Sequence, residues 1–307
     1  MDSLTVAIRF GLYLDLMILF GTAAFHLYAL PGSLIDRRRP GSPGMLLFVA
    51  GLAGVALSAF GLVALAASMA GMTVLTVDRA SVSALLWGTS IGTAGVVRTL
   101  ALLLALPCAL LLPRSRGMAL TGTALLGALA LGSLAWSGHG VMDDGAIGWL
   151  HLGADIVHLF AAGLWVGALL GLLRLVMRQG GYDGTHLRRT HHALESFSRM
   201  GTLVVALILL SGLVNGWLLV GPAHVRDLLA SPYGRLLAAK LVLFAAMLLF
   251  AATNRFRLTP ALGTVTSGRP ASLGALRASL VLETGAALAI LGLVAWLGTL
   301  QPPVSGM

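Results

Sequence analysis

The segment from Trp149 to Met177 reads WLHLGADIVHLFAAGLWVGALLGLLRLVM, and its only charged residues are Asp155 and Arg174. A run of roughly 20 mostly apolar residues is long enough to cross the hydrocarbon core of a bilayer as an α-helix. We therefore predict that this segment spans a membrane. Its histidines and its aspartate are costly in hydrocarbon, so they are the first candidates for a functional role.

The composition of the whole chain agrees with this prediction. Of its 307 residues, 58% are hydrophobic and only 10% are charged, whereas about a quarter of the residues in a soluble domain are charged. This excludes most soluble enzymes, nucleic-acid readers and disordered proteins. We find no hydrolase, phosphate-binding or zinc-protease motif, so the chain is not expected to be an enzyme. The single cysteine, Cys108, excludes an intramolecular disulfide.

Apolar segments of sufficient length recur along the chain and cover most of it. They lie at about Thr5–Leu30, Gly44–Met69, Gly92–Leu112, Met118–Trp136, Trp149–Met177, Met200–Val220, Tyr233–Thr253 and Ser272–Leu300. A shorter apolar piece, Val82–Ile91, cannot cross and is predicted to lie at the interface. The sequence therefore predicts an all-α polytopic membrane helix bundle of about eight transmembrane helices, forming a single integral membrane domain over residues 1–307.

Basic residues are concentrated in the connections after the first, third, fifth and seventh predicted spans. They are Arg37, Arg38, Arg39, Arg114, Arg116, Arg178, Arg188, Arg189, Arg255, Arg257 and Arg269, with Arg174 and Arg199 at the flanking helix ends. The other connections hold only Arg79 and Arg226. Because cytoplasmic loops carry the excess of Lys and Arg, both termini are predicted to lie outside. The net charge of +9 then reflects topology and not nucleic-acid binding.

Several charged residues fall within the predicted spans. Asp15 and Glu283 lie near mid-depth, and Arg98 and the single lysine, Lys240, lie nearer the outer side. Such residues pair with one another or mark an ion pathway, and the two roles are compatible. We expect Lys240 to pair with Glu283 and Arg98 with Asp15. The remaining basic residues, Arg9, Arg235 and Arg277, lie near span ends, where their long side chains reach the interface.

His151, Asp155 and His158 are the most informative polar residues. Their offsets of four and seven residues place them on one face of the fifth span. His139 ends the preceding span, and Met142 follows it in the connection. Imidazole suits Zn, Cu, Fe and Ni, and a thioether favours Cu(I), so these residues predict a metal or haem site at the outer end. The alternative is that the histidines only cap a helix or pair with Asp155.

The other histidines give weaker signals. His26 lies near the inner end of the first span, as an exit ligand or an interfacial residue. His186, His191 and His192 lie in the basic segment Thr185–His192, which we interpret as a solvated cytoplasmic loop. His224 lies in an outer connection, where it can assist the mouth of the site.

Four stretches in the C-terminal third recur in the order and spacing of a known family. They are Phe197-Ser198-Arg199 with Ser211-Gly212-Leu213-Val214-Asn215; Ser231-Pro232-Tyr233-Gly234-Arg235-Leu236-Leu237 with Lys240; Asn254-Arg255 with Pro260; and Leu276-Arg277-Ala278-Ser279 with Leu282-Glu283 and Pro302-Pro303. In these stretches, over about residues 196–303, the chain resembles the bacterial copper resistance protein D (CopD) family. Gly138-His139, the run from His151 to His158 and the run from Gly163 to Gly167 extend the resemblance upstream. Gly140 stands where related sequences often have alanine.

The resemblance implies a multi-pass protein of the bacterial inner membrane that handles copper in resistance and homeostasis. The termini, which the charge distribution predicts to lie outside, are then periplasmic. The resemblance also implies a small periplasmic copper-binding partner of the CopC type. The candidate metal ligands are then His139, His151, Asp155 and His158, with Met142 assisting. Tyr233, Arg235, Lys240, Asn254 and Glu283 are family positions without an assigned role.

Two classes of function remain open. The first is copper ion transport, with capture by the outer histidines and passage near Asp15, Lys240 and Glu283. The second is a membrane electron carrier or copper reductase that binds haem b. Imidazoles seven residues apart on one helix lie about 10 Å apart and cannot both ligate one haem iron, so haem ranks second. A membrane scaffold or sensor that binds copper without moving it is a third interpretation.

Overall fold

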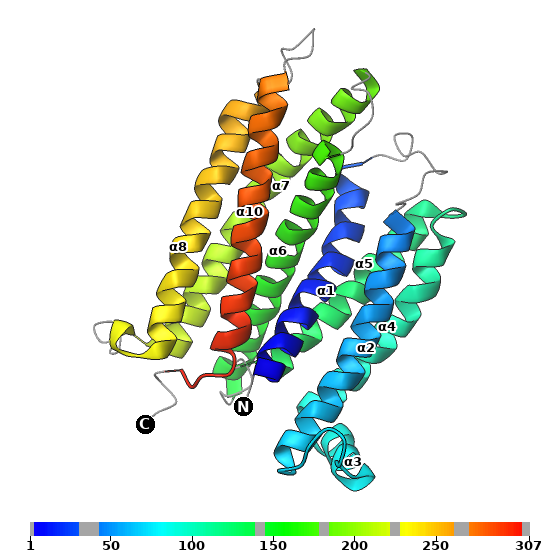
Figure 1. Cartoon of the computed structure of the whole chain (residues 1–307), viewed down its shortest axis with the longest axis vertical. Helices are drawn as coiled ribbons and strands as arrows, with labels where there is room; N and C mark the ends of the chain where they lie inside the picture. The colour runs from blue at the N-terminus through cyan, green and yellow to red at the C-terminus, as the bar shows by residue number, and fades with distance from the viewer. Residues whose placement is uncertain are drawn as a thin grey trace.

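The computed structural model describes residues 3–30, 43–138, 145–177, 184–221, 228–260 and 270–302. These residues form helices and contain no strand (Figure 1). Within the described ranges, eight helices are long and apolar enough to cross a membrane. The all-α architecture of a multi-pass membrane protein is therefore confirmed, and each predicted span coincides with one of these helices.

The helices follow one another with short connections. In chain order they are α1 Ser3–Tyr28, α2 Pro43–Met69, α3 Arg79–Gly88, α4 Ser90–Leu111, α5 Arg116–Gly132 with the 3₁₀ turn η2 Ser133–Ser137, α6 Gly145–Met177, α7 Gly184–Val220, the 3₁₀ turn η5 Leu228–Ala230, α8 Pro232–Thr253 with the π-helical turn η6 Asn254–Leu258, and α10 Pro270–Leu297.

The long helices form two groups that share α1 (Figure 1). In the first group, α1, α2, α4 and α5 enclose an apolar core that contains Leu16, Leu47, Leu102 and Leu120. In the second group, α6, α7, α8 and α10 enclose a core around Leu172. Because α1 also packs against α6 and α10, it joins the two groups along the middle of the molecule.

Glycines bring the backbones of α1 and α6 into direct contact. A Cβ added at Gly21 would collide with the carbonyl oxygen of Gly163, and one added at Gly167 would collide with the backbone of Gly21. One turn further along α6, a Cβ at Gly171 would collide with the ring of Phe25. Small residues permit such close approach between helices in a membrane, where packing rather than water exclusion drives association. These contacts fix the junction between the two groups.

Two segments of the sequence differ in structure from what we predicted. Most of the apolar piece at Val82–Ile91 belongs to the short α3, which ends at Gly88 and is not among the eight spanning helices, and its last two residues begin α4. Its N-cap Asp78 accepts a hydrogen bond from the Ser81 amide at 2.8 Å, and hydrogen bonding from Ser81 holds the pKa of the Asp78 carboxyl below its usual range. The stabilisation of α3 by ionised Asp78 is therefore fully present above the ordinary aspartate pKa. It is lost as the pH falls through the lowered pKa of Asp78.

The interpretation of Thr185–His192 as a loop was wrong, because helix α7 begins at Gly184. This basic segment contains no proline, and straight-chain residues such as arginine and leucine favour a helix. The i,i+4 ion pair of Glu195 and Arg199, with 2.6 Å between Oε1 and Nη2, supports the same extension. The helix α7 thus continues well beyond the length needed to span a bilayer.

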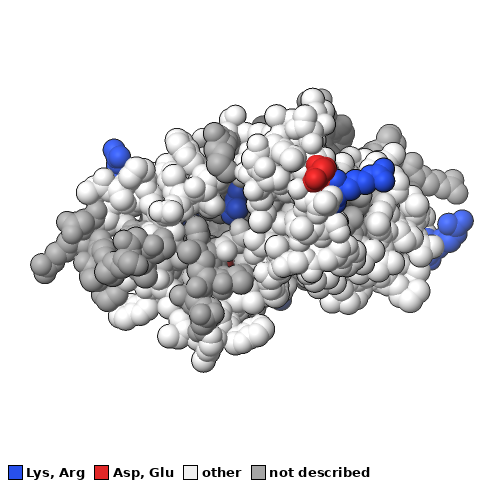
Figure 2. All heavy atoms as spheres, turned by 90° about the horizontal axis from the view of Figure 1, so that it is seen from below, with Lys and Arg blue, Asp and Glu red and all other residues white. Residues whose placement is uncertain are grey.

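The charges divide between the two ends of the bundle. We call the end where α1 begins and α10 ends the terminal face, and the other end the basic face (Figure 1). At the basic face, the described basic residues on helix ends and connections are Arg114, Arg116, Arg174, Arg188, Arg189, Arg199, Arg255, Arg257 and Arg277. Seen from the terminal face, the described surface is mostly uncharged (Figure 2). The structure thus keeps the charge asymmetry of the sequence.

The α1–α6 contact predicts a stability difference between two glycine positions. Gly167→Ala places a methyl group against the Gly21 backbone, and overpacking of this kind costs about 1–3 kcal/mol. Gly216→Ala on α7 has no atom within 4 Å of the added carbon and serves as the matched control. We expect thermal unfolding in detergent to show a lower midpoint for Gly167→Ala alone. Equal midpoints for the two variants would contradict the close contact.

Candidate metal site and polar clusters

Polar side chains from three helices meet in the half of the bundle nearer the terminal face. They belong to a group that we call the α6–α7–α8 cluster, consisting of Asp155, His158, Ser211, Asn215 and Lys240. The helices α6 and α7 are antiparallel neighbours. Asp155 therefore lies opposite Asn215, and His158 lies opposite Ser211, and each pair is hydrogen-bonded. The cluster therefore holds three membrane helices in a single register.

Asp155 is the acidic member of the cluster. Its Oδ1 accepts a hydrogen bond of 2.6 Å from Nδ2 of Asn215, and the charge of Lys240 on α8 acts on it directly. The phenol of Tyr233, buried at the start of α8, also lies within its electrostatic reach. Three helices thus contribute polar groups to this one carboxylate.

The predicted partner of Lys240 was wrong, because the lysine lies near Asp155 and not near Glu283. Glu283 bonds to Asn254, which follows Lys240 by 14 residues along the helix formed by α8 and η6. At 1.5 Å per residue this separation is about 21 Å. The sequence showed that Lys240 needs an acid, but it did not show the depth at which each helix presents its charge.

His158 is held in one orientation by α7. Its Nδ1 lies 3.0 Å from Oγ of Ser211, and that hydroxyl donates its single proton to the carbonyl oxygen of Leu207. Ser211 Oγ therefore accepts the hydrogen bond, and the proton of a neutral His158 sits on Nδ1. The lone pair is then on Nε2, which is the arrangement of a metal-binding histidine whose other nitrogen is fixed by a neighbouring group.

The remaining predicted ligands are placed less completely. His151 is buried, with 1% of its surface exposed. His139 and Met142 lie outside the described residues. Gly138, the residue before His139, lies beside Asp155, since a Cβ added to it would be 3.7 Å from Oδ2. Within the described ranges, no three His, Cys, Asp or Glu side chains form a metal-binding group.

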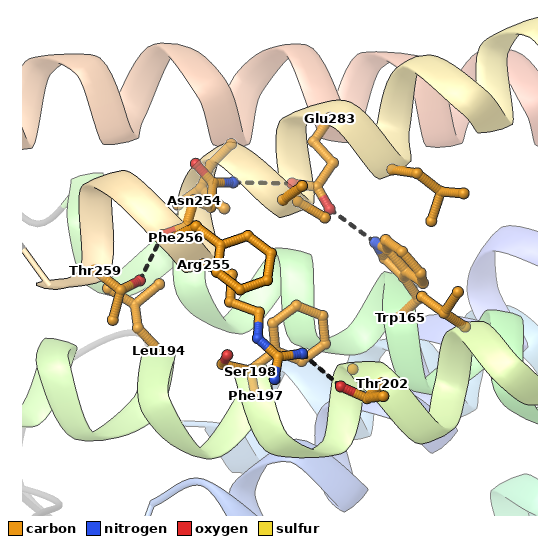
Figure 3. A pocket seen from close by; sticks show the side chains of 16 residues that line it. Trp165, Leu194, Phe197, Ser198, Thr202, Asn254, Arg255, Phe256, Thr259 and Glu283 are labelled. Atoms are coloured by element: carbon orange, nitrogen blue, oxygen red, sulfur yellow. Dashed lines mark hydrogen bonds between the residues drawn. The ribbon is translucent and has the colours of Figure 1, made fainter.

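Glu283 belongs to a second cluster, nearer the basic face. Its Oε1 accepts a hydrogen bond of 2.8 Å from Nε1 of Trp165, and its Oε2 accepts one of 3.1 Å from Nδ2 of Asn254 (Figure 3). These residues line a cavity of about 250 Å³. Trp165 lies seven residues after His158 on α6, so one helix carries groups of both clusters.

Arg98 and Asp15 occupy the first helix group but do not pair as predicted. Arg98 is 4% exposed and donates to the hydroxyl oxygens of Ser58 at 3.1 Å and Ser133 at 3.4 Å. Asp15 packs against Gly54 and has a buried Oδ2 with no hydrogen-bond partner among the described residues. Gly54 lies four residues, about one turn, from Ser58, so the two charges are displaced along the bundle.

The other predicted polar residues lie near the two ends. His26 lies near the basic face, and its Nδ1 donates to the carbonyl oxygen of Thr22 at 2.8 Å. Arg277 donates to the carbonyl oxygen of Val176 at 2.9 Å, and Arg9 donates to that of Ser137 at 3.2 Å. Arg235 is exposed near the terminal face. Arg9 and Arg277 thus satisfy carbonyl oxygens at the ends of helical segments.

Both halves of the chain match models of known protein families. Residues 1–149 match the family model "Copper resistance protein D-like, N-terminal domain", and residues 191–297 match the model "Copper resistance protein D". Copper resistance protein D of Pseudomonas syringae pv. tomato is 39% identical over 306 residues, which cover 98% of this chain and 97% of the relative.

The chain belongs to the copper resistance protein D family.

Two shorter similarities are to other bacterial proteins. The inner membrane protein YebZ of Escherichia coli (strain K12) is 31% identical over 127 residues, or 41% of this chain and 42% of the relative. The copper transport protein CutJ of Bacillus subtilis (strain 168) is 30% identical over 121 residues, or 39% of this chain and 21% of the relative. None of the solved structures matches the chain. The resemblance to the copper resistance protein D family is therefore confirmed.

Sequence reasoning missed the contacts that hold the two clusters together. Ser211 and Asn215 are spaced four residues apart inside an apolar span, and this spacing predicts one polar stripe on α7. This polar stripe on α7 was the feature from which a contact with the polar stripe on α6 could have been predicted. Ser58 and Ser133 gave no such signal, because isolated serines are common in membrane helices.

The electrostatic interaction between Lys240 and Asp155 predicts a coupling between two substitutions. Lys240→Met removes the cation and leaves the Asp155 charge, which is more costly than removing both charges together. We expect Asp155→Asn to rescue Lys240→Met, with a coupling energy of about 0.5–3 kcal/mol. Unfolding of the single and double variants in detergent gives this energy.

The same set of single and double variants, with Glu283→Gln in place of Asp155→Asn, is the matched control. Since Lys240 and Asn254 are separated by about 21 Å along α8 and η6, the effects of Lys240→Met and Glu283→Gln should be additive within about 0.5 kcal/mol. Coupling to Glu283 with additivity at Asp155 would contradict the assignment.

Proposed function

We propose that this member of the copper resistance protein D family transports copper ions across the bacterial inner membrane, and so contributes to copper resistance and homeostasis. The names of its relatives support a role in handling copper, and the eight spanning helices are suited to moving an ion. The polar clusters at different depths offer successive positions for an ion, as conduction requires. We take the protein to be a transporter and not an enzyme.

The orientation follows from the division of charge. The excess of Lys and Arg marks the cytoplasmic side of a membrane protein, so we assign the basic face to the cytoplasm and the terminal face to the periplasm. The α6–α7–α8 cluster then lies in the periplasmic half. A small periplasmic copper-binding protein of the CopC type is the partner we expect at this face.

Copper capture is assigned to the histidines at the periplasmic end. The observation that carries this assignment is the Nδ1 bond from His158 to Ser211, which leaves Nε2 as the nitrogen with a lone pair. We propose that His139 and His151 join His158 as ligands, with Met142 assisting. Asp155 lies beside Gly138, the neighbour of His139, and its charge favours a cation there.

Passage toward the cytoplasm is assigned to the polar residues deeper in the bundle. We expect Lys240 and Tyr233 to adjust the charge around Asp155, and Glu283 and His26 to lie on the way out. Asp15 and Arg98 form a separate polar region in the first helix group. We expect Arg235, which is exposed near the terminal face, to contact the copper-binding partner.

Copper flux into proteoliposomes tests the proposed ligands. We expect the double variant His151→Ala/His158→Ala to reduce flux at least about tenfold, since loss of even an outer-shell partner costs 10–100-fold in metal affinity. His192→Ala, an exposed histidine on α7 at the basic face, is the matched control and should leave flux unchanged. Unchanged flux in the double variant would overturn the ligand assignment.

The serine behind His158 provides a finer test. Ser211→Ala keeps the imidazole but removes the group that fixes its orientation, so we expect copper affinity to fall about tenfold. Affinity is measured by equilibrium binding to the purified protein. An absorption spectrum of the same sample tests haem b, because a Soret band with reduced α and β bands would replace the transport proposal by electron transfer.

A further inference from the structure

Glu283 lies at the buried end of a cavity that reaches the surface near the basic face. The cavity is about 250 Å³ in volume and lies between α6, α7, α10 and the end of α8 (Figure 3). Its lining extends from Phe256, which is 70% exposed, to Glu283, which is 1% exposed. A polar group at the end of such a passage can exchange protons with water from one side of the membrane.

The carboxylate has donors but no hydrogen-bonded cation in the described part of the protein. Trp165 donates to Oε1 and Asn254 donates to Oε2, and both donors are neutral. Burial of a charge without a cation is unfavourable, and such residues in membrane helices are retained mainly for function. The site therefore stabilises the ionised form only by hydrogen bonds, which leaves the protonated form accessible as well.

Asn254 can serve both protonation states of Glu283. In the structure its Nδ2 donates to Oε2, while its Oδ1 is buried and has no hydrogen-bond partner among the described residues. Rotation of the amide by half a turn would present Oδ1 to a protonated Glu283, which can donate its O–H. Trp165 would continue to donate to the other oxygen. Each carboxyl oxygen of Glu283 thus keeps a hydrogen-bond partner with or without the proton.

The backbone at Asn254 is specialised. Asn254 begins the π-helical turn η6, and the hydroxyl of Thr259 donates to its carbonyl oxygen at 2.8 Å. Turns of this kind occur frequently at functional sites. Here the turn lies where α8 reaches the basic face, and it places the amide against α10.

The other titratable groups on the surrounding helices are engaged elsewhere. Arg255 lines the same cavity and donates to the hydroxyl of Thr202, and its guanidinium lies 5.4 Å from the centre of the Phe256 ring. On α7, Arg199 pairs with Glu195. On α1, His26 bonds to Thr22, and Arg116 and Arg174 act on it electrostatically. Arg277 on α10 donates to Val176.

We propose that Glu283 is a proton-binding site that exchanges with the cytoplasmic side through this cavity and couples proton movement to transport. The step is a simple protonation: the carboxylate takes a proton from water in the cavity, becomes a carboxylic acid, and later returns the proton. The inference rests on the proposed copper transport for its coupling, but the protonation itself is independent of copper.

Infrared difference spectroscopy of the purified protein, titrated with pH, tests the protonation. We expect a buried carboxylic-acid C=O band that titrates in the wild type and is lost in Glu283→Gln. Glu195→Gln, which changes the exposed glutamate at the same face, is the matched control and should keep the band. Glu283→Asp, which retains a carboxyl group, should restore a titrating band. A band unchanged by Glu283→Gln would overturn the proposal.

Copper flux in proteoliposomes with an imposed pH gradient tests the coupling. If one proton moves per copper ion, a gradient of one pH unit changes the steady-state copper ratio about tenfold. We expect Glu283→Gln to abolish this dependence while copper binding at the periplasmic site stays unchanged. A ratio that still follows the gradient in Glu283→Gln would overturn the coupling.

The two measurements separate this inference from the function on which it rests. Absence of copper flux in the wild type would contradict the transport proposal and the coupling together, whereas the infrared band would still decide whether Glu283 binds a proton. Flux that depends on His151 and His158 but not on Glu283 would retain the transport proposal and reject the coupling.

Discussion

In the hydrocarbon core of a bilayer, a polar side chain can be satisfied only by another part of the protein, and this constraint organises the bundle. Asp155 bonds to Asn215 and His158 bonds to Ser211, so α6 and α7 are locked in one register. Glu283 joins α10 to α6 and to the end of α8 through Trp165 and Asn254. The polar groups to which we assign the proposed transport are therefore also the groups that align the helices.

The glycine contact between α1 and α6 complements these polar bonds. It brings two backbones so close that no side chain fits between Gly21, Gly163 and Gly167. Because α6 also carries Asp155, His158 and Trp165, the junction of the two helix groups lies on the helix that presents both clusters. A change in the packing of α1 would therefore be transmitted to both polar positions in the second group.

The two clusters have different chemical character. The α6–α7–α8 cluster combines an imidazole with a fixed tautomer, a carboxylate and a lysine side chain, and it suits a cation that prefers nitrogen ligands. The Glu283 cluster has a carboxylate with neutral donors and an amide with a free acceptor, and it suits a proton. The two clusters are separated by about two turns of α6, from His158 to Trp165.

Much of the fold followed from local features of the chain. Length and hydropathy were sufficient to predict the eight spans, and the periodicity of α6 was sufficient to bring His151, Asp155 and His158 to one face. The same reasoning failed at Thr185–His192, because a charged segment gives no apolar signal although its residues favour a helix. The pairing of Arg98 with Asp15 failed because the depth of each residue was known only to within a turn.

The sequence by itself determined that the chain is a multi-pass helical membrane protein, which residues are costly to bury, and which family it belongs to, since these properties depend on composition, spacing and identity. Only the tertiary structure decided that Arg98 bonds to two serines, that Glu283 bonds to Trp165 and Asn254, and that Asp155 is the acid that acts electrostatically on Lys240. The physical reason is that a partner depends on the rotation and axial position of two separate helices. Those are set by side-chain packing across the whole bundle and not by any one segment.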